Sequence, residues 1–167
     1  MRKSYYAAHV YMILGVISGL YSREFTKAHD FEGDTQLDLM HTHLLALGML
    51  AFLIVLALDK QFQLSGTKLF TNFFWFYNAG ITISVAMMFV HGTETVLGSH
   101  VPEAVPWIAG LGHTLLTVGL ILLFVLLGKR LNEPVETGPV STGPATTAPV
   151  QTGPAEAGPS GPESART

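Results

Sequence analysis

The sequence predicts an all-α integral membrane protein, a four-helix bundle followed by a disordered C-terminal tail. Three observations lead to this fold class. The 167-residue chain has a mean hydropathy of +0.39 and only 13% charged residues, about half of the share in soluble domains. Four long segments of the chain contain no charged residue. The end of the chain has a different composition, rich in proline and glycine.

The four uncharged segments are each long enough to cross a bilayer. They cover residues 4–22, 39–58, 69–93 and 104–128, and hold 19, 20, 25 and 25 residues. A helix needs about 20 predominantly apolar residues to cross the roughly 30 Å hydrocarbon core. Only helices and closed barrels satisfy their backbone there, and these segments are too long for barrel strands. We therefore predict transmembrane helices at about 4–22, 37–58, 69–91 and 105–128, within a domain formed by residues 1–131.

Lysine and arginine predict the orientation of these helices. If the N-terminus is cytoplasmic, the inner ends of the helices carry six of them: Arg2, Lys3, Lys60, Lys68, Lys129 and Arg130. The outer loops then carry only Arg23 and Lys27. This asymmetry follows the positive-inside rule. It predicts a multi-pass protein of the plasma (inner) membrane with both termini in the cytoplasm. The residues before Arg23 contain no clear small-x-small cleavage site, so the first segment is predicted to stay as a helix.

Residues 132–167 are predicted to form a disordered, Pro/Gly-rich cytoplasmic tail. Prolines recur at every fifth position from Pro134 to Pro159, usually after a glycine. Such a repeat cannot bury enough apolar surface to offset the entropy of ordering it.

Composition also excludes several classes of function. The chain has no cysteine, so disulfides, thiolate chemistry and Cys-based metal centres are excluded. A net charge of -3 without a basic patch argues against nucleic acid as a partner. No nucleophile elbow, phosphate-binding loop or dinucleotide fingerprint is present. No catalytic residue is identified, and whether the protein is an enzyme stays open.

Four of the seven histidines are predicted to lie at one depth, in the outer half of the membrane. His41 and His43 begin the second helix and His91 ends the third. His113 lies about 10 Å inside the fourth, at 1.5 Å per residue. Polar residues in spans usually face the bundle interior, and neutral imidazole is the commonest metal ligand. Without cysteine, the natural candidates are haem iron, and copper as the alternative.

The spacing of His41 and His43 limits what they can share. Two residues of α-helix separate them by about 200° around the axis. A pair that chelates one ion would be three or four residues apart. The spacing therefore predicts that the two imidazoles face opposite flanks of the helix.

The stretch from His41 to Met49, HTHLLALGM, resembles the His-x-His…Leu-Gly segment of subunit I of haem–copper oxidases, especially the C-type branch. It also resembles the related nitric-oxide-response membrane haem protein. The resemblance covers about nine residues and implies haem b, bound by axial histidines near the outer surface. The chain differs from the oxidase subunit because it has four predicted spans instead of twelve and lacks the copper-ligand pattern. Oxygen reduction and proton pumping are therefore not implied. Nearly everything before the tail is also similar to a family of small four-helix bacterial membrane proteins of unknown function.

The resemblance implies partners and further ligands as well. The oxidase subunit consists of three similar four-helix arcs, so this chain could form a homotrimer, or another homo-oligomer, with haem between His41 of one copy and His43 of the next. Arg23 and Lys27 are then candidates to bind the haem propionates. Two axial imidazoles imply electron transfer with a redox partner, and an open position implies binding of a diatomic gas such as NO or O₂. The alternatives are a copper- or metal-binding membrane protein, and a structural or accessory subunit without a cofactor.

Overall fold

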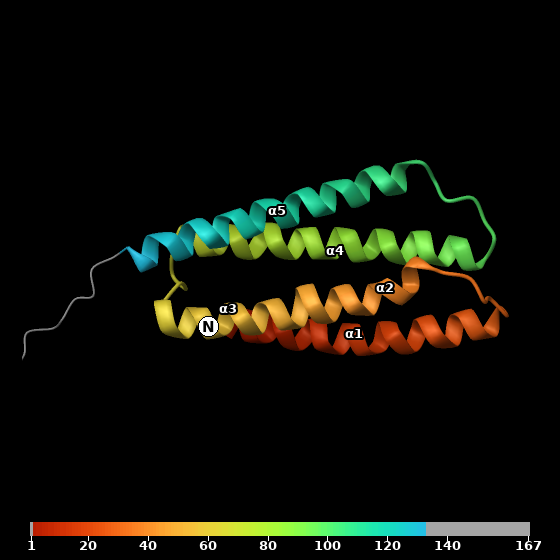
Figure 1. Cartoon of the computed structure of the whole chain (residues 1–167), viewed down its shortest axis with the longest axis horizontal. Helices are drawn as coiled ribbons and strands as arrows, with labels where there is room; N and C mark the ends of the chain where they lie inside the picture. The colour runs from red at the N-terminus through yellow and green to blue at the C-terminus, as the bar shows by residue number, and fades with distance from the viewer. Residues whose placement is uncertain (1, 133–167) are drawn as a thin grey trace, which may run out of the picture. The chain divides into compact units, whose positions relative to one another are not determined.

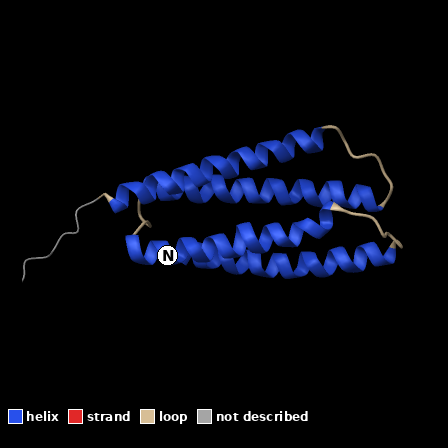
Figure 2. Cartoon of the chain, viewed as in Figure 1, coloured by secondary structure: helices blue, strands red, loops and turns tan. Residues whose placement is uncertain are grey.

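A computed structural model describes residues 2–132 of the chain, and this part is helical without strands (Figures 1 and 2). Its elements are α1 (Arg2–Ala28), α2 (Gln36–His43), the π-helix η1 (Leu44–Leu50), α3 (Ala51–Phe62), α4 (Lys68–Val96) and α5 (Ala104–Leu131). Because α2, η1 and α3 continue into one another, residues 36–62 form one continuous helix. This part therefore consists of four long helices, in the order predicted. The predicted disorder from residue 133 onward lies outside the described residues.

Three of the four predicted helices have the length and composition that crossing a membrane requires. Gln36–Phe62, Lys68–Val96 and Ala104–Leu131 are long and apolar enough to cross a membrane. Helix α1 is not among them, because it carries polar residues such as His9 and Ser18 along its length and charged residues near both ends.

Each helix extends beyond the uncharged segment that predicted it, and α1 differs most. It continues through Arg23 and Lys27, which were predicted to lie in a loop, and ends at Ala28. There Asp30 adopts a left-handed backbone with φ of 49°, and the Phe31 N–H donates to the Thr26 carbonyl at 3.0 Å. This is the hydrogen bonding of a helix C-terminal cap. The charged residues mark the predicted end of the membrane-spanning segment. The helix itself continues past them and ends at its C-terminal cap.

Two helical hairpins pack side by side in this part of the chain (Figure 1). Helix α4 lies along α5, and α1 lies along α2, η1 and α3. Small residues allow the close approach of α4 and α5, because a Cβ on Gly80 would lie 2.7 Å from the Leu116 backbone nitrogen. The two hairpins meet where Thr35, the N-cap of α2, donates to the Gly92 carbonyl of α4 at 3.0 Å.

A buried aspartate closes the connection between α3 and α4. Asp59 is fully buried and accepts hydrogen bonds from the Ser65 N–H, at 2.6 Å, and from the Ser65 hydroxyl. Gln63 follows in a left-handed conformation, and Thr67 then caps α4 by accepting from the Phe70 N–H at 3.1 Å. The turn is therefore fixed by specific contacts.

Candidate functional site

A groove of about 320 Å³ lies between α2, α4 and α5, and three of the four predicted histidines line it. His43 comes from α2, His91 from α4 and His113 from α5. Ser84, Met87 and Met88 of α4 also line the groove. Three imidazoles from three helices therefore share one concave surface, although His43 and His91 are half-buried and His113 is exposed.

The lining residues of each helix follow the period of an α-helix. On α4 they are Ser84, Met87, Met88 and His91, spaced three, four and seven residues from the first. Residues at such spacings share one helical face. The stripes 36–39–43 on α2 and 106–109–113 on α5 follow the same rule.

Backbone carbonyls orient two of the three groove histidines. His43 Nδ1 lies 2.9 Å from the Leu39 carbonyl oxygen, and His113 Nδ1 lies 2.9 Å from that of Ala109. A carbonyl can only accept, so Nδ1 carries the hydrogen and the neutral ring keeps its lone pair on Nε2. Metal-ligating histidines are commonly oriented by such a bond. His29 makes the same contact with Phe25 outside the groove, so the bond alone does not identify a ligand.

His91 is held less firmly than its two neighbours in the groove. Its Nδ1 lies 3.4 Å from Thr95 Oγ1, beyond the usual range of a hydrogen bond. The Thr95 hydroxyl donates instead to the His91 carbonyl at 2.8 Å. The geometry therefore does not fix which nitrogen of His91 is available for coordination.

His41 lies on a different flank of α2 from His43. Its ring is next to α1, where a Cβ on Gly19 would lie 3.6 Å from His41 Cβ and Cγ. His41 does not line the groove, and its buried Nδ1 has no hydrogen-bond partner among residues 2–132. The two histidines thus face different surroundings, as their spacing predicts.

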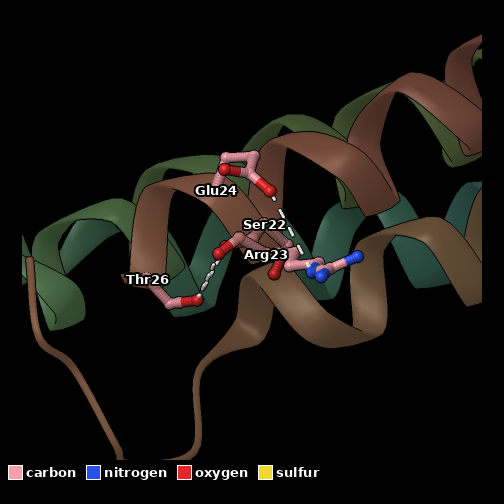
Figure 3. A network of polar contacts seen from close by, with 4 residues as sticks. All are labelled: Ser22, Arg23, Glu24 and Thr26. Atoms are coloured by element: carbon pink, nitrogen blue, oxygen red, sulfur yellow. Dashed lines mark hydrogen bonds and ion pairs between the residues drawn. The ribbon is translucent and has the colours of Figure 1, made fainter. Parts of the chain in front are cut away.

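Arg23 and Lys27, the two cations predicted to lie on the outer side, do not line the groove. Arg23 is on the exposed surface of α1, with its Nε 4.0 Å from Glu24 Oε1 (Figure 3). Lys27 is exposed one turn further along. Exposed pairs of this kind contribute little to stability. Nearby, Ser22 donates to Asp38 Oδ1 at 2.5 Å, which ties α1 to the start of α2.

Sequence reasoning did not include Ser84 among the candidate site residues. Only 2% of this residue is exposed, and its hydroxyl has no hydrogen-bond partner in the described part of the chain. Its spacing of seven residues from His91 places both on the same face of α4. That spacing could have identified Ser84 as a site residue. A small residue at this position is equally expected from helix packing, so the sequence alone did not single it out.

The groove does not contain a ready-made metal site with three ligands. Within residues 2–132, no three His, Asp or Glu side chains are close enough to hold one ion together. A cofactor that supplies most of the ligands of its own metal needs fewer ligands from the protein. Haem needs only one or two axial groups from the protein.

A match to a known protein family covers almost all of the helical part of the chain. Residues 1–130 match the family described as "Protein of unknown function (DUF2871)". The chain belongs to this family. The match agrees with the predicted similarity to an uncharacterised membrane family, and no similarity to haem–copper oxidases is found. No curated protein and no solved structure matches the chain.

Proposed function

We propose that the protein is a membrane b-type haem-binding protein, with haem held in the groove between α2, α4 and α5. The observation that carries the proposal is the convergence of His43, His91 and His113 on this groove. His43 and His113 are the preferred axial ligands, because the contacts of their Nδ1 atoms leave Nε2 available.

The apolar surroundings of the histidines support a porphyrin better than a hydrated ion. Much of the groove wall is formed by apolar residues, among them Leu39, Met87, Met88 and Val105. A macrocycle would cover this apolar surface and place its iron near an imidazole. Two axial histidines would serve electron transfer, and one would leave a position for NO or O₂.

The membrane topology is part of the same proposal. We place all four helices across the plasma membrane, with both termini in the cytoplasm. The outward face of α1 is apolar, because it exposes Val10, Val16, Ile17 and Leu20. Lipid would cover that face, while the polar residues Ser4, Ser18 and Ser22 are buried.

A homo-oligomer would account for an exposed polar face of α5 and for the two cations that lie outside the groove. His113 is exposed together with Gly110, Thr114 and Thr117 on the same face of α5, and polar residues within spans usually face protein. Arg23 and Lys27 do not line the groove of their own chain. If they bind haem propionates, they do so from a neighbouring copy.

Copper binding is the second candidate function. Methionine thioethers and imidazoles together are suitable ligands for Cu(I), and Met87 and Met88 line the groove with the three histidines. Such a protein would be colourless, with copper in stoichiometric amounts.

Three single variants of the full chain test the haem proposal. We expect His43→Ala and His113→Ala to lower the haem content at least severalfold. His29→Ala is the matched control, because His29 makes the same Nδ1–carbonyl contact outside the groove. The pyridine haemochrome assay measures haem per chain. Equal haem in all three variants would show that the groove is not the site.

A further inference from the structure

A second groove lies between α1 and α4 and consists of two adjoining parts, one of which is also lined by Met40 of α2 and Leu44 of η1. The part near the start of α1 has a volume of about 450 Å³, and the part further along has about 580 Å³. Tyr11, Leu14 and Thr82 line both parts, so the two are continuous. We call this surface the α1–α4 groove. It shares no lining residue with the histidine groove.

The length of the α1–α4 groove matches the hydrocarbon core of a bilayer. Its wall follows α1 from Lys3 to Tyr21, about 27 Å at 1.5 Å per residue, against roughly 30 Å for the core. The first part, from Lys3 to Leu14, is about 17 Å long. One leaflet is about half as thick as the core, so this part is long enough for one acyl chain.

The wall of the first part has few hydrogen-bonding groups available to a polar ligand. Val10, Leu14 and Phe74 form apolar surface. The polar groups between them are already paired, because the Tyr11 hydroxyl donates to Asn78 Oδ1 at 2.8 Å and Asn78 Nδ2 donates to the Phe74 carbonyl at 2.7 Å. A hydrocarbon chain fits such a wall, whereas a polar headgroup at this depth does not.

A cation stands at the end of this apolar wall. Lys3 lines the groove, is exposed, and forms no ion pair within residues 2–132. Tyr6 also lines this part of the groove and is 62% exposed, as is typical of aromatic residues at a membrane interface. The groove thus combines an apolar channel with a positive charge where a lipid headgroup would lie.

We propose that the first part of the α1–α4 groove binds one anionic phospholipid. One acyl chain lies along α1 from Tyr6 to Leu14, and the headgroup phosphate pairs with the Lys3 ammonium. The charge complementarity selects an anionic lipid, and the length and apolar wall select a hydrocarbon chain. This proposal does not depend on haem.

Native mass spectrometry of the full-length protein in a mild detergent tests the site. Phosphatidylglycerol and phosphatidylcholine with the same acyl chains are titrated separately. We expect one phosphatidylglycerol per chain, bound more tightly than phosphatidylcholine. Lys3→Gln should weaken phosphatidylglycerol about fivefold, the effect of roughly 1 kcal/mol for one lysine near anionic lipid. It should weaken phosphatidylcholine less, because the choline ammonium of that lipid offsets the charge of its phosphate.

Two further variants distinguish the groove from the general lipid surface. Val10→Trp fills the groove and should lower binding of both lipids. Ile13→Trp introduces the same side chain at a similarly exposed residue of α1 that does not line either part, and it should have no effect. Arg2→Gln is the matched control for Lys3→Gln, because it removes the neighbouring positive charge from a residue that does not line either part.

The proposal is overturned by equal affinity for the two lipids, or by equal effects of Val10→Trp and Ile13→Trp. It is also overturned if the protein is a dimer that Val10→Trp dissociates, because a second copy then fills the groove. Circular dichroism confirms that each variant is folded before the titration. Loss of haem in these variants is not expected, so failure here leaves the histidine groove unaffected.

Discussion

The hydroxyl of Ser84 on α4 lies directly against Gly112 of α5, at the wall of the histidine groove. A Cβ on Gly112 would be only 2.5 Å from Ser84 Oγ and 3.0 Å from the Ser84 backbone nitrogen. The same face of α4 carries His91, and His113 follows Gly112 in the sequence. Packing between α4 and α5 and the shape of the groove are therefore set by the same contact.

This contact predicts that Gly112→Ala destabilises the protein. The added methyl group would press on a backbone atom that cannot move by itself, which typically costs about 1–3 kcal/mol of unfolding free energy. Gly110→Ala is the matched control, since nothing lies within 4 Å of a Cβ there. It should be neutral, or stabilising by up to about 1 kcal/mol through helix propensity. Unfolding by denaturant in detergent measures both, and equal stabilities would contradict the packing described.

Ser84→Ala is predicted to leave the cofactor-free protein as stable as the wild type, or more stable by about 1 kcal/mol. The buried hydroxyl has no partner in the described residues, and an unsatisfied buried polar group costs roughly 1–3 kcal/mol. Its replacement by a methyl group removes that cost. A clear loss of stability in the melting curve would mean that the hydroxyl has a partner in solution.

Asp59→Asn is predicted to weaken the connection between α3 and α4. The carboxylate accepts from both the N–H and the hydroxyl of Ser65, and hydrogen bonds to charged groups contribute about 1.5–3 kcal/mol. An amide in its place has only one accepting oxygen. We expect a loss of that order in denaturant unfolding. The exposed neighbour Lys60, changed to Gln, should stay within about 0.5 kcal/mol of the wild type.

The π-helix offers a prediction of its own. The Tyr77 hydroxyl donates to the Leu47 carbonyl in η1 at 3.0 Å. Tyr77→Phe removes this donor from a residue that is 2% exposed. We expect faster hydrogen exchange of the amides in Leu44–Leu50, and a cost of about 1 kcal/mol. Exchange that rises equally along α5 would instead indicate general loosening.

Charge placement in the sequence predicted where three helices long and apolar enough to cross a membrane lie, because charges are costly in hydrocarbon. It did not predict the length of α1, since Arg23 and Lys27 are compatible with a helix and the end is set by the left-handed Asp30. It also missed η1. A π-helix has no composition of its own and depends on tertiary contacts such as that from Tyr77.

The candidate site was partly predictable for a related reason. The depth of His43, His91 and His113 follows from counting residues along helices, and it suggested a shared region. Whether they share one surface depends on how α2, α4 and α5 rotate about their axes, which is set by packing contacts such as Gly112 on Ser84. The packing of α2 on α1, in which His41 lies next to Gly19, places His41 away from that surface.

The reduced-minus-oxidised absorption spectrum of the purified full-length protein is the most direct test of the central claim. If the histidine groove binds haem b, the protein has a Soret band that shifts on reduction with dithionite, and the double variant His43→Ala/His113→Ala loses it. A colourless wild-type protein, prepared from cells supplied with iron and haem precursor, would contradict the account. So would a Soret band of unchanged intensity and position in the double variant.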